Sequence, residues 1–252
     1  MNLESYRRFT EDLRRTLEAD PRVVGLVALG SMAELGRTPD RWSDHDFFVI
    51  TRPGEQRAFR ESAKWLPDAG RVVLFFQETA HGGKALYDSG HLVEFAVFDP
   101  DEISVARVND HRILFDRERV GERMRLAAAK TAAERPATAE SLAGQFLTNL
   151  VVASGRDERG ETASAREMLA SAVRHLAQLI ATRISAVGTT SLDNLDPLRR
   201  FEWVYAETGE AIEAAMRMPV RPAAEALLEI FVKTAATSDE LRAVAAVRSA
   251  TH

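Results

Sequence analysis

The sequence predicts an α+β protein, in which an N-terminal part of strands and helices is followed by an all-helical C-terminal part. Two observations support this. Up to about residue 116, short apolar and β-branched runs alternate with segments of helical spacing. From about Val120 onward the chain is rich in alanine and has few strand-like runs. Because Pro136 marks a linker, we expect one domain over residues 1–135 and a helical bundle over residues 136–252.

The N-terminal part opens with an amphipathic helix, because apolar residues recur at helical spacing from Leu3 to Leu17 and Asp20-Pro21 ends the pattern. Apolar and β-branched runs predict strands over residues 22–29, 44–51, 71–77, 84–87, 91–98 and 112–115. Between them we expect a helical turn over 32–35, a helix over 55–66, a surface loop over 81–84 and a short helix after Asp99-Pro100.

The C-terminal part is predicted from helical spacing alone. The pattern indicates helices over residues 122–133, 140–153, 165–184, 198–207, 223–235 and 240–247. Two helix starts gain support from the spacing of a capping box, with Ser164 followed by Glu167 and Thr237 followed by Glu240.

Composition narrows the classes of function. The chain of 252 residues has a formal net charge of −5 and no cysteine. Disulfides, thiolate metal sites and cysteine nucleophiles are therefore excluded, and no basic field attracts nucleic acid. The first 20 residues are too charged for a signal peptide, and no run approaches the roughly 20 apolar residues of a membrane span. We expect a cytoplasmic protein without nucleic-acid or membrane partners, as a monomer or homodimer.

One segment has a pattern typical of phosphate and metal chemistry. A predicted strand ends in Gly30-Ser31, where the backbone can turn sharply and approach a ligand. Asp44 and Asp46 are two positions apart at the start of the next predicted strand, so their side chains point to one face. Paired carboxylates repel each other unless a cation joins them, and Mg²⁺ with substrate phosphates is a usual partner. The simpler alternative is a strand-entry cap and a solvent-facing acid.

A third acid lies in a later predicted strand. Glu94 is the lone charge in an apolar run, and a buried carboxylate without a partner is costly. If the strands are neighbours, Glu94 could complete a metal cluster or act as the base on an acceptor; on an edge strand it would face water. His45, between the two aspartates, is expected to point to the opposite face and to pack or form hydrogen bonds there.

This order of residues resembles the nucleotidyltransferase superfamily that includes DNA polymerase β, and within it the small bacterial aminoglycoside and lincosamide nucleotidyltransferases. The motif falls on Gly30, Ser31, Asp44, Asp46 and Glu94, and the resemblance covers about residues 22–116. Family members often have Ser-x-Ala-Arg-Gly after the glycine, whereas this chain has Glu34 at the arginine position. Arg37 is the residue that could compensate for it.

The resemblance implies a mixed sheet flanked by helices, a helical acceptor-binding domain, and an enzyme of the EC 2.7.7 type. Asp44, Asp46 and Glu94 would be catalytic and would hold two Mg²⁺ ions, while Gly30, Ser31 and Arg37 would bind the nucleoside triphosphate. A small hydroxylated acceptor, such as an antibiotic, would receive the nucleoside monophosphate, and pyrophosphate would leave. Two alternatives stay open at this point: a protein-modifying adenylyltransferase of the antitoxin type, and a non-catalytic nucleotide sensor of the same fold.

Overall fold

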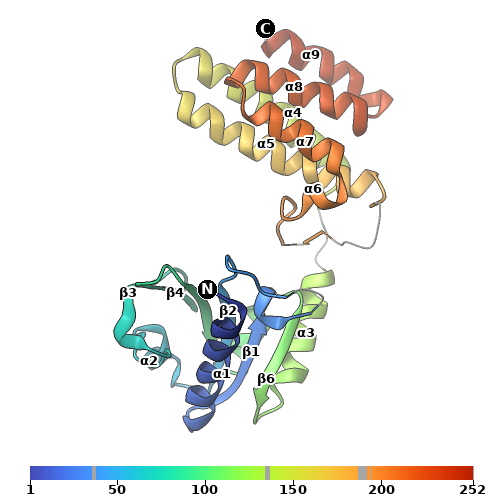
Figure 1. The fold of residues 1–252 in the computed structure, drawn as a ribbon. Coiled ribbons are helices and arrows are strands. Elements are labelled where there is room, and N and C mark those ends of the chain that lie inside the picture. The colour runs from blue at the N-terminus through green and yellow to red at the C-terminus, as the bar shows by residue number, and fades with distance from the viewer. Residues whose placement is uncertain (36–37, 134–136, 187–191, 194, 252) are drawn as a thin grey trace. The chain divides into compact units, whose positions relative to one another are not determined.

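The computed structural model describes residues 1–35, 38–133, 137–186, 192–193 and 195–251. The chain divides into two compact units, Met1–Glu134 and Arg135–His252 (Figure 1). The N-terminal unit contains a sheet with helices on both faces, and the C-terminal unit consists of helices. The α+β class predicted from the sequence is therefore confirmed.

The six-stranded sheet of the N-terminal unit is mixed. Its strands have the order β3-β4-β5-β2-β1-β6, and every neighbouring pair is antiparallel except β2 and β5, which are parallel. Because β2 and β5 are parallel and in direct register, residues far apart in the sequence lie side by side at the same end of the sheet. The strands are β1 (Val23–Leu29), β2 (His45–Thr51), β3 (Val72–Gln77), β4 (Gly82–Tyr87), β5 (Leu92–Phe98) and β6 (His111–Asp116).

Helices cover the two faces of this sheet. Helix α1 (Leu3–Ala19) buries Tyr6, Phe9, Leu13 and Leu17 against one face, which we call the α1 side. Helix α3 (Val120–Ala133) and the 3-10 helix η3 (Glu102–Val105) pack on the other face, the α3 side. Along β2, Phe47 and Val49 belong to the α1 side, whereas Phe48 and Ile50 belong to the α3 side. This alternation fixes which way each β2 side chain points.

Two local predictions for the N-terminal unit were wrong. Helix α2 (Gln56–Arg60) is shorter than the predicted helix over 55–66, because the Ser62 hydroxyl accepts a 3.2 Å hydrogen bond from the Lys64 amide and offers the backbone a turn instead. The 3-10 helix η2 (Ala69–Arg71) follows it. Residues 82–84 begin strand β4 rather than forming a loop. Glycine at position 82 allows the Thr79 hydroxyl to approach closely, because a Cβ atom there would lie 3.0 Å from it.

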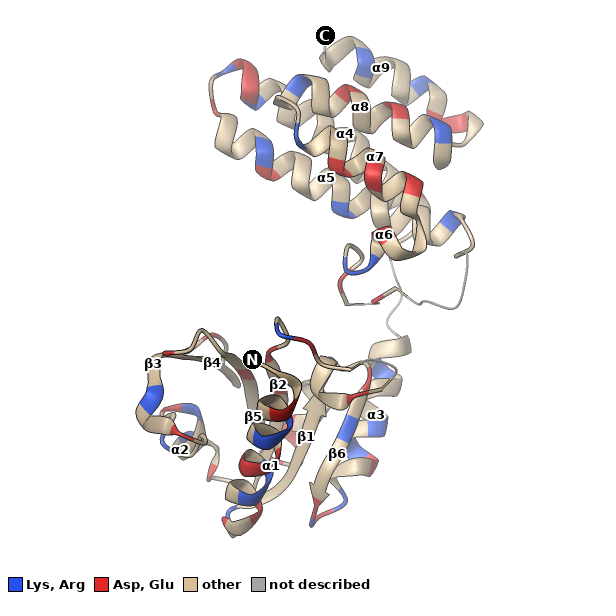
Figure 2. Ribbon diagram, in the orientation of Figure 1, with Lys and Arg blue, Asp and Glu red and all other residues tan. Residues whose placement is uncertain are grey.

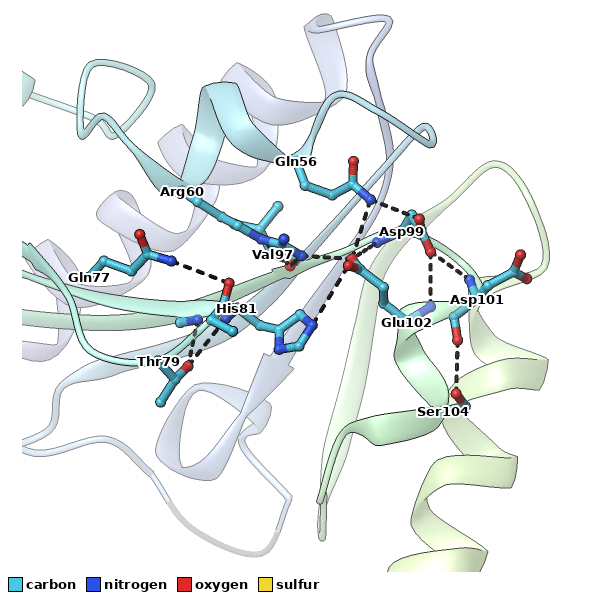
Figure 3. A network of polar contacts seen from close by, with 12 residues as sticks. Gln56, Arg60, Gln77, Thr79, His81, Val97, Asp99, Asp101, Glu102 and Ser104 are labelled. Atoms are coloured by element: carbon cyan, nitrogen blue, oxygen red, sulfur yellow. Dashed lines mark hydrogen bonds and ion pairs between the residues drawn. The ribbon is translucent and has the colours of Figure 1, made fainter.

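A polar network ties α2 to η3 beyond the far end of β5 (Figure 3). The Glu102 carboxylate accepts hydrogen bonds from Arg60 Nη2 at 2.6 Å, from the Asp99 amide at 3.0 Å and from Gln56 Nε2 at 3.3 Å. The His81 ring lies 3.6 Å from the same carboxylate and stacks on Phe98. Although burial opposes the effect, the bonds from Asp99 and Arg60 lower the pKa of Glu102.

Replacing Glu102 by glutamine is expected to lower the free energy of unfolding by about 1–2 kcal/mol, because Arg60 loses its charged acceptor. Since the folded-state pKa is depressed, the stabilisation is present above pH ~4.3 and disappears as the pH falls through the folded pKa. Urea unfolding of wild type and Glu102→Gln at pH 7 and pH 3 measures it. Asp101→Asn, an exposed carboxylate beside it, is the control and should be nearly neutral. Equal stability of Glu102→Gln and wild type at pH 7 would contradict the assignment.

The C-terminal unit is a helical bundle whose core is built around Phe146, Leu169, Leu176, Leu227 and Phe231. Among the described residues, no helix is long and apolar enough to cross a membrane. The helices are α4 (Ala139–Glu158), α5 (Thr162–Arg183), α6 (Phe201–Val204), α7 (Ala206–Met216), α8 (Val220–Thr234), the 3-10 helix η4 (Ser238–Glu240) and α9 (Leu241–Thr251).

Three details of the bundle test the predicted helix boundaries. The capping box of Thr237 and Glu240 is confirmed, with the Thr237 amide donating to the Glu240 carboxylate at 2.8 Å. The one at Ser164 is wrong, because α5 already begins at Thr162 and the Ser164 hydroxyl accepts from Arg156 Nη1 at 2.6 Å. The helix predicted over 198–207 is instead split at Tyr205 into α6 and α7.

Candidate active site

The turn at the end of β1 brings the backbone close to a carboxylate. Gly30 has a φ of +48°, in the left-handed region that favours glycine, and it begins the 3-10 helix η1 (Gly30–Ala33). A Cβ atom at this position would lie 3.8 Å from Asp46 Oδ2. Gly30 and Asp46, which are separated by a loop in the sequence, are thus neighbours in space.

Tyr6 of α1 locks this turn onto the start of β2. Its hydroxyl donates to the Asp44 carbonyl oxygen at 2.7 Å and lies 3.3 Å from Ser31 Oγ, which also donates to the Asp44 carbonyl oxygen at 3.3 Å. Burial raises the pKa of the Tyr6 phenol; the hydrogen bond with Ser31 opposes the shift, and the negative charges of Asp44, Glu34 and Asp46 add to it. The raised pKa keeps the Tyr6 phenol neutral, with Asp44, Glu34 and Asp46 close enough for their charges to act on it.

His45 confirms the expected alternation at the start of β2. Its side chain is fully buried on the α1 side, where its ring stacks on Tyr6 with 3.8 Å between the ring centroids. The two ring nitrogens lie 2.9 Å from Thr10 Oγ1 and 2.8 Å from His91 Nε2. Because His45 points to the α1 side, the alternation along β2 directs the half-buried Asp46 to the α3 side.

A row of charged residues crosses three strands on the α3 side. In the β2–β5 ladder Asp46 is in register with Glu94, and in the β4–β5 ladder Glu94 is in register with Lys84. The Lys84 ammonium lies 3.1 Å from the Glu94 carboxylate and 3.0 Å from that of Glu78. Like charges directly opposite each other on a sheet are destabilising, so Lys84 offsets part of the repulsion between Glu94 and Asp46.

Glu94 therefore lies beside Asp46, but it is half-buried and pairs with Lys84, which differs from the solitary buried acid inferred from the sequence. Within the described part of the chain, no group of three histidine, aspartate or glutamate side chains is arranged to hold a metal ion. Two carboxylates with nucleotide phosphate oxygens are nevertheless a usual environment for Mg²⁺. Asp44 and Asp46 fit such a site by their chemistry, and Asp46 also fits it by its place beside Gly30.

The residues around the Gly-Ser turn depart from the resembled motif. Glu34, which stands where the family has arginine, pairs with Arg7 of α1 at 2.9 Å. Arg37, predicted to bind nucleotide, lies outside the described residues. The sequence did not predict the hydrogen bonds of Tyr6 with Ser31 and Asp44, because Tyr6 was interpreted as helix core. It also did not predict the ion pair of Lys84 with Glu94, because Lys84 was interpreted as part of a loop. The polar hydroxyl of Tyr6 at a buried helix position was the available signal.

A groove of about 390 Å³ runs between α1 and β6, close to Glu34. Its arginines are engaged: Arg7 pairs with Glu34, and Arg14 pairs with Glu11 and Glu18. Figure 2 shows these mixed charges along α1. Neither Asp44 nor Asp46 lines the groove, which is therefore distinct from the carboxylate site. Its lining residues are Arg7, Thr10, Glu11, Arg14, Glu34, Arg112, Ile113 and Leu114.

Comparison with solved structures finds neighbours at low identity, two of which are described here. No family model and no curated protein matches the sequence. A nucleotidyltransferase-like protein from Exiguobacterium sibiricum 255-15 is 13% identical, with a TM-score of 0.37, over 96% of this chain and 78% of its own. An aminoglycoside 6-adenyltransferase from Bacillus subtilis is 12% identical, with a TM-score of 0.30, over 95% of this chain and 90% of its own. At TM-scores of this size the two neighbours carry no argument about function, which has to be inferred from the site itself.

Proposed function

We propose that this chain is a Mg²⁺-dependent nucleotidyltransferase, of the EC 2.7.7 type, that moves AMP from ATP to a hydroxyl group of a small molecule. The observation that supports this most is the arrangement of Asp44 and Asp46 on either side of the buried His45, beside the Gly30 turn. Carboxylates beside a turn whose left-handed backbone favours glycine are suited to binding a metal-bound triphosphate. A purely structural role would not require both features together.

Different residues of the site would bind the metal, bind the phosphates and position the turn. Asp44 and Asp46, with Glu94 beside them, would hold Mg²⁺, which supplies charge stabilisation for the attacking and leaving oxygens when it is bound. Gly30 and Ser31 present backbone N–H groups and a hydroxyl to the phosphates, and Arg37 is proposed to assist. Tyr6 keeps Ser31 and the Asp44 backbone together through its hydroxyl.

The reaction forms one bond and breaks one. The acceptor oxygen attacks the α-phosphorus, the bond from that phosphorus to the bridging oxygen breaks, and pyrophosphate leaves with the electron pair. The hydroxyl proton needs a base, and Glu94 is a further carboxylate in register with Asp46. Lys84 holds the Glu94 carboxylate from the opposite side. Glu94 is thus either a ligand of the metal or the base that accepts the hydroxyl proton. Glu94→Gln should weaken metal binding in the first case and leave it unchanged in the second.

We assign residues 1–135 to catalysis and residues 136–252 to acceptor selection, in a cytoplasmic enzyme. An antibiotic is one acceptor of the required kind, which would make the protein a resistance factor. The position of Glu34 favours a second candidate, a nucleotide sensor without transfer activity, because its carboxylate and its partner Arg7 replace a simple cation next to the turn. The sensor would bind nucleotide and release no pyrophosphate.

A pyrophosphate-release screen tests the proposal. The purified chain is incubated with Mg²⁺, each of the four nucleoside triphosphates in turn, and a panel of aminoglycosides and lincosamides. Release that requires both one nucleotide and one acceptor, and that Asp46→Asn abolishes, is the expected result. Tight nucleotide binding with no release for any acceptor would instead favour the sensor, and labelling of a partner polypeptide would favour a protein-modifying enzyme.

A further inference from the structure

The loop that leads into the paired aspartates presents a tryptophan to solvent. Trp42 is 78% exposed, and it is the most exposed of the large apolar side chains among the described residues. It precedes Asp44 by two positions. Large aromatic side chains gain free energy mainly by burial, so an indole left in water beside a candidate active site calls for a partner.

Hydrogen bonds fix the backbone of the loop around Trp42. The Asp40 carboxylate accepts a 2.8 Å hydrogen bond from the Trp42 amide, and the Ser43 hydroxyl accepts a 3.0 Å bond from the Asp40 amide. The N-terminal ammonium of Met1 donates to the Arg41 carbonyl oxygen at 3.2 Å, and Pro39 is buried. A loop backbone fixed in this way loses little conformational entropy when it binds a ligand.

A cation covers one face of the ring. The Arg41 guanidinium lies over the indole with its central carbon 4.5 Å from the ring centroid, a cation–π contact. The pair therefore combines a positive charge with a flat apolar surface. A nucleoside triphosphate has the complementary parts, since its phosphates are anionic and its base is flat and aromatic.

We propose that Trp42 is the stacking platform for the base of the nucleoside triphosphate, an inference that rests on the proposed function. Every nucleobase has a π-face, so stacking on an indole tolerates all four bases and sets affinity rather than choice of base. Mg²⁺-ATP therefore engages two separate features, with its phosphates at Gly30 and Asp46 and its base on Trp42. Inorganic tripolyphosphate, which has no base, engages only the first.

Calorimetry with two probes separates these features. Trp42→Ala is expected to weaken Mg²⁺-ATP binding by roughly tenfold or more and to leave Mg²⁺-tripolyphosphate binding unchanged. Trp42→Phe, which keeps an aromatic ring, should stay within about threefold of wild type. Trp203→Ala is the matched control, because Trp203 is 65% exposed and belongs to the C-terminal unit. Thermal unfolding checks that all variants are folded.

Fluorescence gives an independent reading. A Trp65→Phe/Trp203→Phe variant keeps Trp42 as the single tryptophan, since the chain has three. ATP should change its emission and tripolyphosphate should not. Unchanged ATP affinity in Trp42→Ala would overturn the inference while leaving the proposed function intact, even if acceptor KM rises. A wild-type chain that binds neither Mg²⁺ probe would overturn the proposed function and the inference with it.

Discussion

Asp46→Asn is expected to reduce nucleotidyl transfer by roughly a thousandfold, which corresponds to about 4 kcal/mol of lost transition-state stabilisation. Asparagine keeps the shape of the side chain and removes the charge that would hold the metal. The expected loss is in kcat, measured as pyrophosphate released with a productive acceptor. Asp44→Asn should act in the same direction, because Asp44 directly precedes β2 and its carbonyl oxygen accepts a hydrogen bond from Ser31 of the same turn.

The fold should survive this change. Asp46 is in register with Glu94, and neutralising one of two facing carboxylates removes a repulsion. The unfolding free energy of Asp46→Asn should therefore stay within about 1 kcal/mol of wild type. Asp101→Asn, an exposed acid of the same unit, should keep full activity. Full activity in Asp46→Asn, or a loss of activity that follows unfolding, would remove the catalytic assignment.

Acid is expected to destabilise the N-terminal unit through its buried histidine pair. Burial, then the charge of His91, lowers the pKa of His45 to about 3; burial, then the N-terminal ammonium, lowers that of His91 to about 4. In the unfolded chain both titrate near pH ~6.5. Below that pH the unfolded state binds protons on both histidines, whereas the folded state does not. The free energy of unfolding therefore falls as the pH drops from about 6.5 toward 4, by on the order of 3 kcal/mol per histidine.

Urea unfolding at pH 7.5, 6, 5 and 4 measures this slope. Trp65 reports on the N-terminal unit alone in a Trp42→Phe/Trp203→Phe background. His91→Gln should be less stable at pH 7.5, because Gln replaces the ring 2.8 Å from His45, and should lose less stability on acidification. Identical slopes for the His91→Gln and wild-type chains would show that the pair does not carry the acid sensitivity.

Much of the fold follows from local patterns. The strand before Gly30 is an apolar run and the strand after Asp44 contains the apolar run from Phe47 to Ile50, and the structure places β1 and β2 there within a residue or two. Helix α1 likewise follows from its apolar spacing. Local patterns did not predict helix ends correctly where a side chain competes for backbone hydrogen bonds, as at Ser62, or where the end of a helix depends on tertiary packing. The break at Tyr205 is an example of the latter, because α6 packs so closely on α7 that a Cβ at Gly209 would lie 2.8 Å from Glu202 Cγ.

The site was predictable in part for the same reason. The Gly30, Ser31, Asp44 and Asp46 pattern is local, and so was the orientation of His45. The partner of Glu94 was not, because it depends on how β4 aligns with β5, and a shift of one residue would move Lys84 to the other face. The Tyr6 contacts join α1 to two loops and likewise depend on tertiary structure.

Equilibrium binding of Mg²⁺-ATP to wild type and to the Asp44→Asn/Asp46→Asn double variant tests the central claim most directly, because it needs no acceptor. Calorimetry is done with and without Mg²⁺. We predict that wild type binds ATP in a Mg²⁺-dependent way and that the double variant loses this dependence while remaining folded. Equal Mg²⁺-dependent affinity in the two chains would contradict a metal–nucleotide site at Asp44 and Asp46.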